Sequence, residues 1–198
     1  MTPFAVLLSG RGTNMEALAA NILKGNLDGR IVLVASDNPE AEGLGKAAAL
    51  GLPTKCYPYG KLGRQAFEEK ISGDITDSGA EWVVLAGFMR ILSPAFVSRF
   101  WGKIVNIHPS LLPSFPGTDA IAKAWRYGVR VTGVTVHLVD EEVDHGRILA
   151  QEPVSLEAGE SIASLESRIH GVEHDLYWRT LQELFKSEAR TLERRTAP

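Results

Sequence analysis

Short apolar runs alternate with helical patterns along most of the chain, and this alternation restricts the fold more than any other feature. The predicted strands span residues 4–9, 30–36, 53–57, 82–88, 103–108, 131–139 and 148–154. The predicted helices span residues 14–24, 39–50, 63–78, 93–100, 118–127 and 161–186. Such alternation favours a parallel sheet, because each parallel pair of strands needs a long crossover connection. We therefore expect an α/β fold with a mostly parallel, twisted, Rossmann-like sheet and helices on both faces.

The chain is long enough for a single domain of this kind. Its 198 residues suffice for one sizeable core. No repeat, low-complexity segment or linker is evident, so we predict one domain over residues 1–186. Residues 187–198 are polar and charged and are predicted to form a C-terminal tail.

Charge and composition argue against several classes of partner. A formal net charge of −3 does not favour a nucleic-acid-binding face, so no nucleic-acid partner is expected. No apolar run reaches membrane-spanning length, and the first residues lack a secretory signal, which predicts a cytoplasmic protein without a membrane partner. The single Cys56 excludes a cysteine zinc cluster, and the five histidines show no metal-binding motif, so no metal is expected.

The predicted strand at 103–108 ends in a pair of polar residues that suggest chemistry. Side chains alternate along a strand, so Asn106 and His108 point to the same side. Asn donates hydrogen bonds and His titrates near neutral pH. At the carboxyl end of a strand, where open α/β sheets bind ligands, this pair indicates a proton-transfer site with an oxyanion donor. A buried, satisfied histidine is an equally good interpretation of the residue types alone.

A second candidate site lies between the first strand and the first helix, at Ser9-Gly10-Arg11-Gly12-Thr13-Asn14. Glycines let the backbone approach a ligand, and a helix start offers free N–H groups and a positive dipole end. Thr13 and Asn14 add side-chain donors. The segment predicts a phosphate site, with a tight capped turn as the alternative. A dinucleotide site is disfavoured because its third glycine would fall at Met15, although Asp37 stands near the place of a ribose-binding acid.

These segments resemble the folate-dependent formyltransferases. Members of that family share an Asn-x-His, a Ser-Leu-Leu-Pro-like loop and a later Asp, which are here Asn106-Ile107-His108, Ser110-Leu111-Leu112-Pro113 and Asp144. The resemblance extends from residue 4 to about residue 186 and implies a single formyltransferase domain. It also implies an enzyme whose catalytic residues are Asn106, His108 and Asp144.

Within the family, Gly12-Thr13-Asn14 is most similar to the transformylases that act on glycinamide ribonucleotide. The resemblance therefore implies transfer of the formyl group of 10-formyltetrahydrofolate to the glycine amine of that ribonucleotide. The products would be formylglycinamide ribonucleotide and tetrahydrofolate, in de novo purine biosynthesis. Two alternatives stay open: formyl transfer to another small amine, such as a nucleotide sugar, and a non-catalytic nucleotide- or folate-binding domain. The chain is expected to be a monomer or a homodimer.

The resemblance also implies binding residues for the two substrates. The ribonucleotide would be bound by Gly12, Thr13, Asn14 and Glu173. The folate would be bound by Arg64, Met89, Arg90, Ile91, Leu92, Val97, Asn106, Asp140 and Asp144. His137 either supports the site or packs structurally. Three features depart from the family pattern and leave their roles open: His170 where Gln is frequent, Arg147 where Pro is common, and Thr118-Asp119-Ala120 in place of a His-containing segment.

Overall fold

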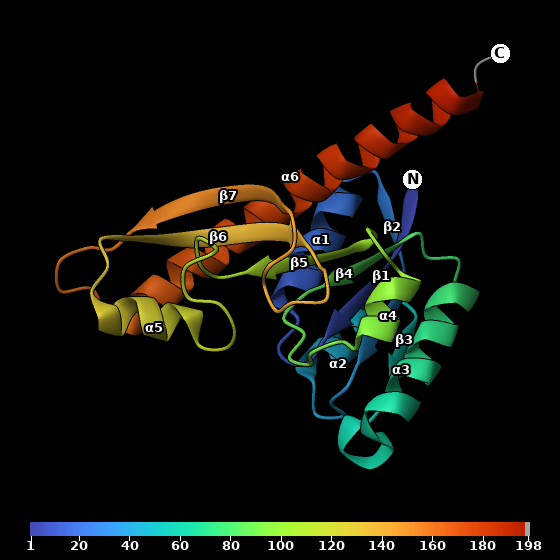
Figure 1. Cartoon of the computed structure of the whole chain (residues 1–198), viewed down its shortest axis with the longest axis horizontal. Coiled ribbons are helices and arrows are strands. Elements are labelled where there is room, and N and C mark those ends of the chain that lie inside the picture. The colour runs from blue at the N-terminus through green and yellow to red at the C-terminus, as the bar shows by residue number, and fades with distance from the viewer. Residues whose placement is uncertain (197–198) are drawn as a thin grey trace.

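The structure is a computed structural model that describes the backbone of residues 1–196 and the side chains of residues 1–188. Its strands are β1 (Thr2–Leu8), β2 (Gly29–Ser36), β3 (Thr54–Cys56), β4 (Trp82–Leu85), β5 (Ile104–His108), β6 (Val131–Leu138) and β7 (Ile148–Ser155). Its helices are α1 (Thr13–Leu23), α2 (Glu42–Ala49), α3 (Tyr59–Asp77), α4 (Pro94–Arg99), α5 (Ala120–Tyr127) and α6 (Ile162–Thr196). The strands form one sheet in the order β3-β2-β1-β4-β5-β6-β7 (Figure 1). The predicted α/β class is confirmed.

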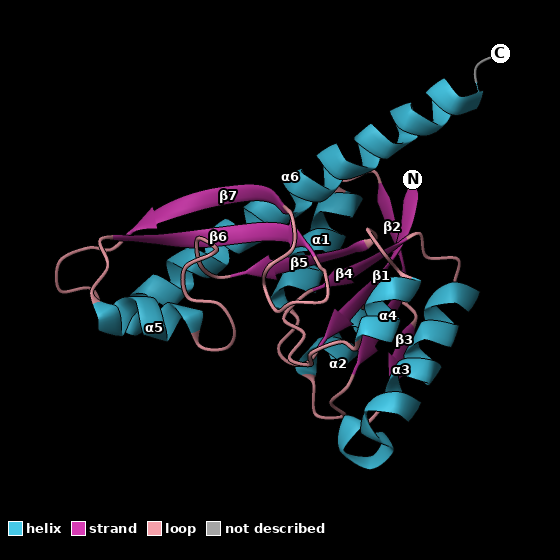
Figure 2. Ribbon diagram, viewed as in Figure 1, coloured by secondary structure: helices cyan, strands magenta, loops and turns pink. Residues whose placement is uncertain are grey.

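Alternation along β1 divides the core into two clusters, one on each face of the sheet. Phe4, Val6 and Leu8 belong to a buried cluster that also contains side chains of α1, α2 and α6. Ala5 and Leu7 belong to the opposite cluster, which contains side chains of α3 and α4. Because both faces of β1 are buried, the strand is a continuous apolar run. Helices therefore cover both faces of the sheet, as predicted (Figure 2).

The sheet changes direction at β5. It is parallel from β3 through β5, whereas β5, β6 and β7 pair antiparallel. The connection 139–147 between β6 and β7 is too short for a parallel crossover, so these strands form a hairpin. At its start, Val139 N–H donates to the carbonyl oxygen of Ile104, at the amino end of β5 (2.9 Å). The loop then folds back over β5, where Asp144 contacts the side chain of His108.

The loops after β1 and β4 meet where the strand order reverses. β1 lies beside β4, and the chain between them forms β2 and β3 on the other side of β1. Ser9 N–H donates to Gly87 O (3.1 Å), and Met89 N–H donates to Ser9 Oγ (2.8 Å). Reversal points of this kind leave a crevice for ligands in open α/β sheets. The segment after β1, predicted to bind the ribonucleotide, and the segment after β4, predicted to bind the folate, are therefore joined by hydrogen bonds.

Several predicted element boundaries differ from the structure by one to several residues. β4 ends at Leu85 instead of residue 88, because the chain turns through Gly87 at a φ of 72°. α3 begins at Tyr59 and is kinked at Gly63, where the helix had been predicted to start. α6 continues through the predicted tail to Thr196, and residues 197–198 lie outside the described part of the chain. No helix within the described residues is both long and apolar enough to cross a membrane.

Candidate active site

The three predicted catalytic residues lie together in the structure. Asn106 and His108 point to the same face of β5, since their neighbours Val105 and Ile107 are buried on the other face, in the cluster that contains side chains of α1, α2 and α6. Asp144 comes from the loop between β6 and β7, and its Oδ2 atom lies 3.4 Å from His108 Nδ1. The His108 and Asp144 side chains are 6% and 10% exposed. Their interaction is therefore weakly screened by water.

Backbone groups of the loop after β5 hold this pair. Gly117 N–H donates to Asp144 Oδ2 (2.7 Å), and His108 Nε2 lies 2.9 Å from the carbonyl oxygen of Phe115. A carbonyl oxygen only accepts, so His108 Nε2 carries a hydrogen in this arrangement. Both ring nitrogens of His108 face oxygen acceptors, which suits a protonated ring. Donation from Nε2 to a substrate oxygen requires the Phe115 carbonyl to move aside, a condition that the residue pattern did not reveal.

Left-handed backbone conformations gather around the same residues. In the described part of the chain, the non-glycine residues with positive φ are Phe115 (53°), Asp119 (59°) and Asp144 (52°). Such conformations are unfavourable for residues with a Cβ atom and concentrate at functional sites. Phe115 and Asp144 both contact His108. The strain is therefore located where the orientation of the imidazole is set.

His137 orients the amide of Asn106. The two residues are partners across β5 and β6, and Asn106 Nδ2 lies 3.2 Å from His137 Nε2. His137 Nδ1 donates to the Leu138 carbonyl oxygen (2.9 Å), which leaves Nε2 as the acceptor for Asn106. Burial lowers the pKa of His137, which favours this neutral form. A supporting role for His137, which the sequence left open, now has a geometric basis: the second N–H of the Asn106 amide stays available.

Gly12 is required by the fold of the predicted phosphate segment. It adopts a φ of 73°, and a Cβ atom there would lie 2.6 Å from the Cα atom of Gly43. The first hydrogen bond of α1 runs from Glu16 N–H to Gly12 O, so the N–H groups of residues 13–15 have no helical acceptor. These groups and the helix dipole suit an anion. The close approach to Gly43 also explains the glycine structurally, so replacing Gly12 would disturb the fold as well as any ligand.

The structure brings Asn14 and Glu173 together across the sequence. Asn14 Nδ2 donates to Glu173 Oε2 (3.4 Å), while Asn14 Oδ1 is buried without a partner. Glu173 is itself buried and also contacts His170, whose other ring nitrogen lies near Arg11. Sequence reasoning had not assigned Arg11 a role. The Asn14 side chain is thus directed to Glu173, and its backbone N–H is the group available to an anion.

The predicted folate segment combines exposed and buried apolar side chains. It begins four residues after Leu85, which pairs with Asn106 in the sheet. Met89 and Ile91 are 65% and 61% exposed, whereas Leu92 and Val97 are buried in the cluster that packs against α3 and α4. Exposed apolar side chains backed by a rigid core are typical of binding surfaces for flat rings.

The side chain of Arg90 is held by a distant residue. Its Nε donates to Asp37 Oδ2 (2.6 Å), and its guanidinium lies over the ring of Tyr59 at 4.5 Å. Asp37 lies at the end of β2 with its side chain 1% exposed. In the sequence, Asp37 stands near the place of a ribose-binding acid. In the structure its carboxylate forms an ion pair with Arg90 instead. The guanidinium of Arg90 is therefore engaged within the protein, and a ligand at the loop after β4 would meet the backbone of Arg90 and not its charge.

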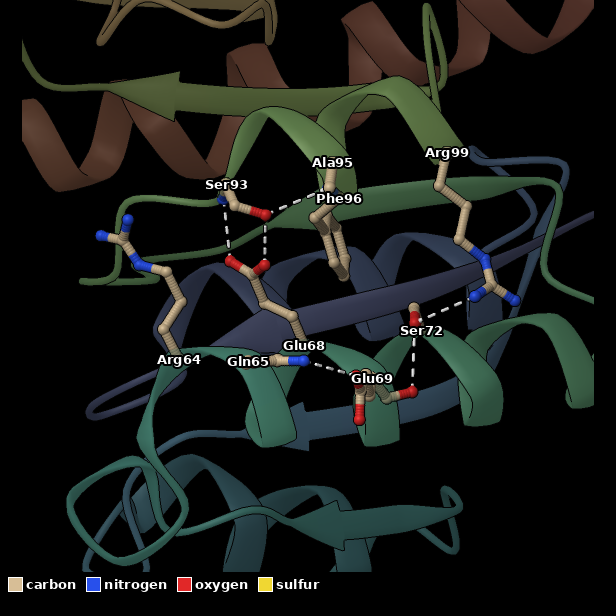
Figure 3. A pocket seen from close by; sticks show the side chains of 9 residues that line it. All are labelled: Arg64, Gln65, Glu68, Glu69, Ser72, Ser93, Ala95, Phe96 and Arg99. Carbon is tan, nitrogen blue, oxygen red and sulfur yellow. Dashed lines mark hydrogen bonds between the residues drawn. The ribbon is translucent and has the colours of Figure 1, made fainter.

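Arg64 lies at one end of an open cavity of about 510 Å³ between α3 and α4 (Figure 3). Within this cavity, Glu68 accepts hydrogen bonds from the N–H and hydroxyl of Ser93, the residue that caps α4. Arg99 donates to Ser72 at 3.3 Å. These polar side chains satisfy one another, so their presence in the lining of the cavity has a structural explanation. It contains none of the catalytic trio, and the Arg64 guanidinium has no hydrogen-bond partner among the described residues.

Asp140 organises the loop between β6 and β7. Its carboxylate accepts from Glu142 N–H (3.0 Å) and pairs with His145 Nδ1 (2.9 Å). That hydrogen bond raises the pKa of His145. The sharp turn needs Gly146, because a Cβ atom there would lie 1.9 Å from the Leu138 carbonyl oxygen. Asp140 therefore shapes the loop that carries Asp144.

The other departures from the family pattern lie at the ends of elements. Asp119 directly precedes α5, and its side chain does not cap that helix. Arg147 is exposed just before β7, and its carbonyl oxygen accepts from Leu138 N–H (2.9 Å). Among the side chains of residues 1–188, no group of three His, Cys, Asp or Glu residues is placed to hold a metal ion.

Comparison with known proteins shows the family to which the chain belongs. The sequence matches the formyl transferase family over residues 2–181. The chain therefore belongs to the formyl transferase family. Its relatives within that family include the phosphoribosylglycinamide formyltransferase of Bacillus subtilis, which is 38% identical over 93% of this chain and 95% of that protein.

Two further relatives extend the comparison. The trifunctional purine biosynthetic protein adenosine-3 of Gallus gallus is 45% identical over 90% of this chain, which spans only 18% of that longer protein. The crystal structure of glycinamide ribonucleotide transformylase 1 from Geobacillus kaustophilus superposes with a TM-score of 0.90 at 44% identity. That match covers 93% of this chain and 98% of the other. The similarity is therefore to the complete fold and not to one motif.

Proposed function

We propose that this chain transfers the formyl group of 10-formyltetrahydrofolate to the glycine amine of glycinamide ribonucleotide, in de novo purine biosynthesis. The observation that carries the proposal is the contact of His108 with Asp144, beside Asn106, in a chain of the formyl transferase family. The relatives named for this activity match the chain over nearly its whole length. The formyl donor and the ribonucleotide are the two substrates.

The reaction is redox-neutral and moves one proton. The neutral glycine amine attacks the formyl carbon, the bond from that carbon to N10 of the folate breaks, and a proton passes from the amine to N10. Negative charge builds on the formyl oxygen during attack, and donors aimed at that oxygen supply much of the catalysis. Asn106 has one amide N–H free of His137, and protonated His108 is the second donor.

Asp144 has two roles: it stabilises charged His108, and it assists the transfer of the amine proton. Its carboxylate stabilises the imidazolium at 3.4 Å, and it assists removal of the amine proton directly or through one water. The Gly117 N–H keeps the carboxylate in place. The left-handed backbone of Asp144 fixes the approach of the loop to β5. Catalysis in this proposal rests on positioned hydrogen bonds and charge.

Substrate binding follows from the two loops at the reversal point of the sheet. The ribonucleotide phosphate binds the N–H groups at the start of α1, next to Thr13, and Glu173 accepts from the ribose. The folate ring lies against Met89 and Ile91, with Leu92 and Val97 as the buried wall. Asp140 and Asp144 close the other side through their loop. Arg64 is assigned to the glutamate end of the folate.

One assay tests the proposal. Loss of 10-formyltetrahydrofolate is followed by absorbance with glycinamide ribonucleotide, with a nucleotide-sugar amine, and without any amine. Rapid loss only with the ribonucleotide, accompanied by formation of its formyl derivative, is expected. Turnover only with the sugar amine would reassign the acceptor. Folate or ribonucleotide binding without turnover would show a non-catalytic domain.

A further inference from the structure

His170 of α6 connects the loop before α1 to a buried carboxylate. Its Nδ1 atom lies 2.8 Å from Glu173 Oε2, and its Nε2 atom lies 3.5 Å from Nη2 of Arg11. Glu173 also accepts from Asn14, so the pair contacts the residues on either side of Gly12 and Thr13. The His170 side chain is 34% exposed and that of Glu173 is 7% exposed. The imidazole thus lies between a buried anion and a cation at the surface.

These neighbours define where the hydrogen on His170 lies. A guanidinium only donates hydrogen bonds, so the Nε2 atom facing Arg11 accepts, and the ring hydrogen is on Nδ1. A second hydrogen on Nε2 would place two positive charges side by side. The hydrogen bond to Glu173 raises the pKa of His170, while burial and the charge of Arg11 oppose that effect. A new negative charge beside Arg11 would shift this balance toward the charged ring.

We propose that His170 takes up a proton when the ribonucleotide phosphate binds at residues 12–14, so that Arg11 and the charged imidazole share the phosphate charge. This inference rests on the proposed function. A second histidine of α6, His174, lies near His170. The other charged or titratable groups around these two rings are Glu166 of α6 and Glu16 of α1. A glutamine at this position would not titrate. The proton linkage is therefore a property of the histidine in this chain.

Calorimetric titration with glycinamide ribonucleotide tests this linkage. Binding that takes up a proton strengthens as the pH falls. The phosphate and amine of the ligand titrate identically with either protein, so the comparison is the ratio of Kd for His170→Gln to Kd for the wild type. That ratio should rise about tenfold from about pH 8.5 to about pH 6, the change that accompanies a rise of one unit in the pKa. His145→Gln, which removes a histidine paired with Asp140, should retain the wild-type dependence.

Nuclear magnetic resonance gives a second readout that needs no variant to bind. The His170 ring signal, identified by its loss in His170→Gln, is titrated with pH in the presence and absence of ribose 5-phosphate. Its midpoint should rise when the phosphate is bound. An unchanged midpoint, or a Kd ratio that is flat with pH, would overturn the inference and leave the proposed function standing. Failure of both proteins to bind the ribonucleotide at any pH would overturn both.

Discussion

At the scale of single residues, the proposed chemistry depends on a charge that is held by a backbone N–H. Asp144→Asn keeps the shape of the side chain and an acceptor for Gly117 N–H, but it removes the negative charge beside His108. We expect kcat to fall by a factor on the order of 10², as is typical when a positioned acid–base or electrostatic group is lost. The KM for the folate should change little, because the backbone of the loop is preserved. Steady-state kinetics measures both quantities.

A double variant tests whether the two residues act as one unit. Residues that share a proton-transfer step show strongly non-additive effects. His108→Ala combined with Asp144→Asn should therefore reduce kcat much less than the product of the two single losses. Fully multiplicative losses, or near-normal kcat in Asp144→Asn, would show that the contact between them is not used in catalysis.

Protonation of His137 at acid pH is expected to lower the stability of the folded chain. Burial lowers its pKa in the folded chain below the value of 6.5 that represents an unperturbed ring. The unfolded chain then binds more protons in this range, so the stability that neutral His137 contributes is present above the unfolded pKa. That stability is lost as the pH falls through the lower folded pKa. Protonation also turns Nε2 into a donor and breaks its hydrogen bond with Asn106.

The expected result is a difference in pH dependence between two proteins. His137→Gln offers Asn106 an acceptor that does not titrate. Urea unfolding at about pH 7.5 and about pH 5.5 should show that the wild type loses more free energy of unfolding on acidification than this variant does. The other histidines are present in both proteins and cancel in the comparison. Parallel curves would mean that His137 is not kept neutral by the fold.

At the scale of elements, a buried hydroxyl of α6 forms hydrogen bonds with the backbone at the centre of the sheet. Tyr177 Oη lies 2.9 Å from the carbonyl oxygen of Leu85 and 3.1 Å from that of Val105. Tyr177→Phe retains the ring and leaves these carbonyls without that donor. Removal of one partner of a buried hydrogen bond costs about 1–3 kcal/mol, and we expect the free energy of unfolding to fall by that amount. A loss below about 0.5 kcal/mol, the range of neutral surface changes, would show that water replaces the hydroxyl.

The order and type of the elements were accessible from the sequence, because apolar periodicity records which faces are buried. The boundaries were less accessible where one glycine decides the backbone, as at Gly87 after β4 and Gly63 within α3. The Asn106 and His108 pair was predictable from the alternation along a single strand. The Asp37 contact with Arg90 was not, because it joins residues that follow two different strands and that no local pattern relates.

At the scale of the whole molecule, one sheet brings distant segments to a common region. The loop after β1, the loop after β4 and the polar face of β5 follow adjacent strands in the sheet. The hairpin of β6 and β7 adds the loop with Asp144, and α6 packs against α1 and adds Glu173. Both candidate substrate sites thus depend on one core, so loss of global stability should weaken the binding of both substrates together.

The predicted domain boundary at residue 186 can be tested by two truncations. Glu188 accepts a hydrogen bond from the indole N–H of Trp82 at 3.2 Å and also pairs with Lys103. Trp82 is 2% exposed, so its N–H would be left buried without this acceptor. The chain 1–188 keeps every described side-chain contact of α6 and should unfold within about 0.5 kcal/mol of the full chain. The chain 1–186 should lose about 1–3 kcal/mol, the cost of an unpaired buried group.

Formyl transfer separates this structural effect from a role in catalysis. Both truncated chains should retain the kcat of the full chain, because Glu188 contacts Trp82 and Lys103 and not the trio around His108. Glu188→Ala in the full chain is the matched control and should reproduce the lower free energy of unfolding of the chain 1–186. If the chain 1–188 is itself strongly destabilised, residues 189–198 belong to the folded domain, and the boundary at residue 186 is wrong.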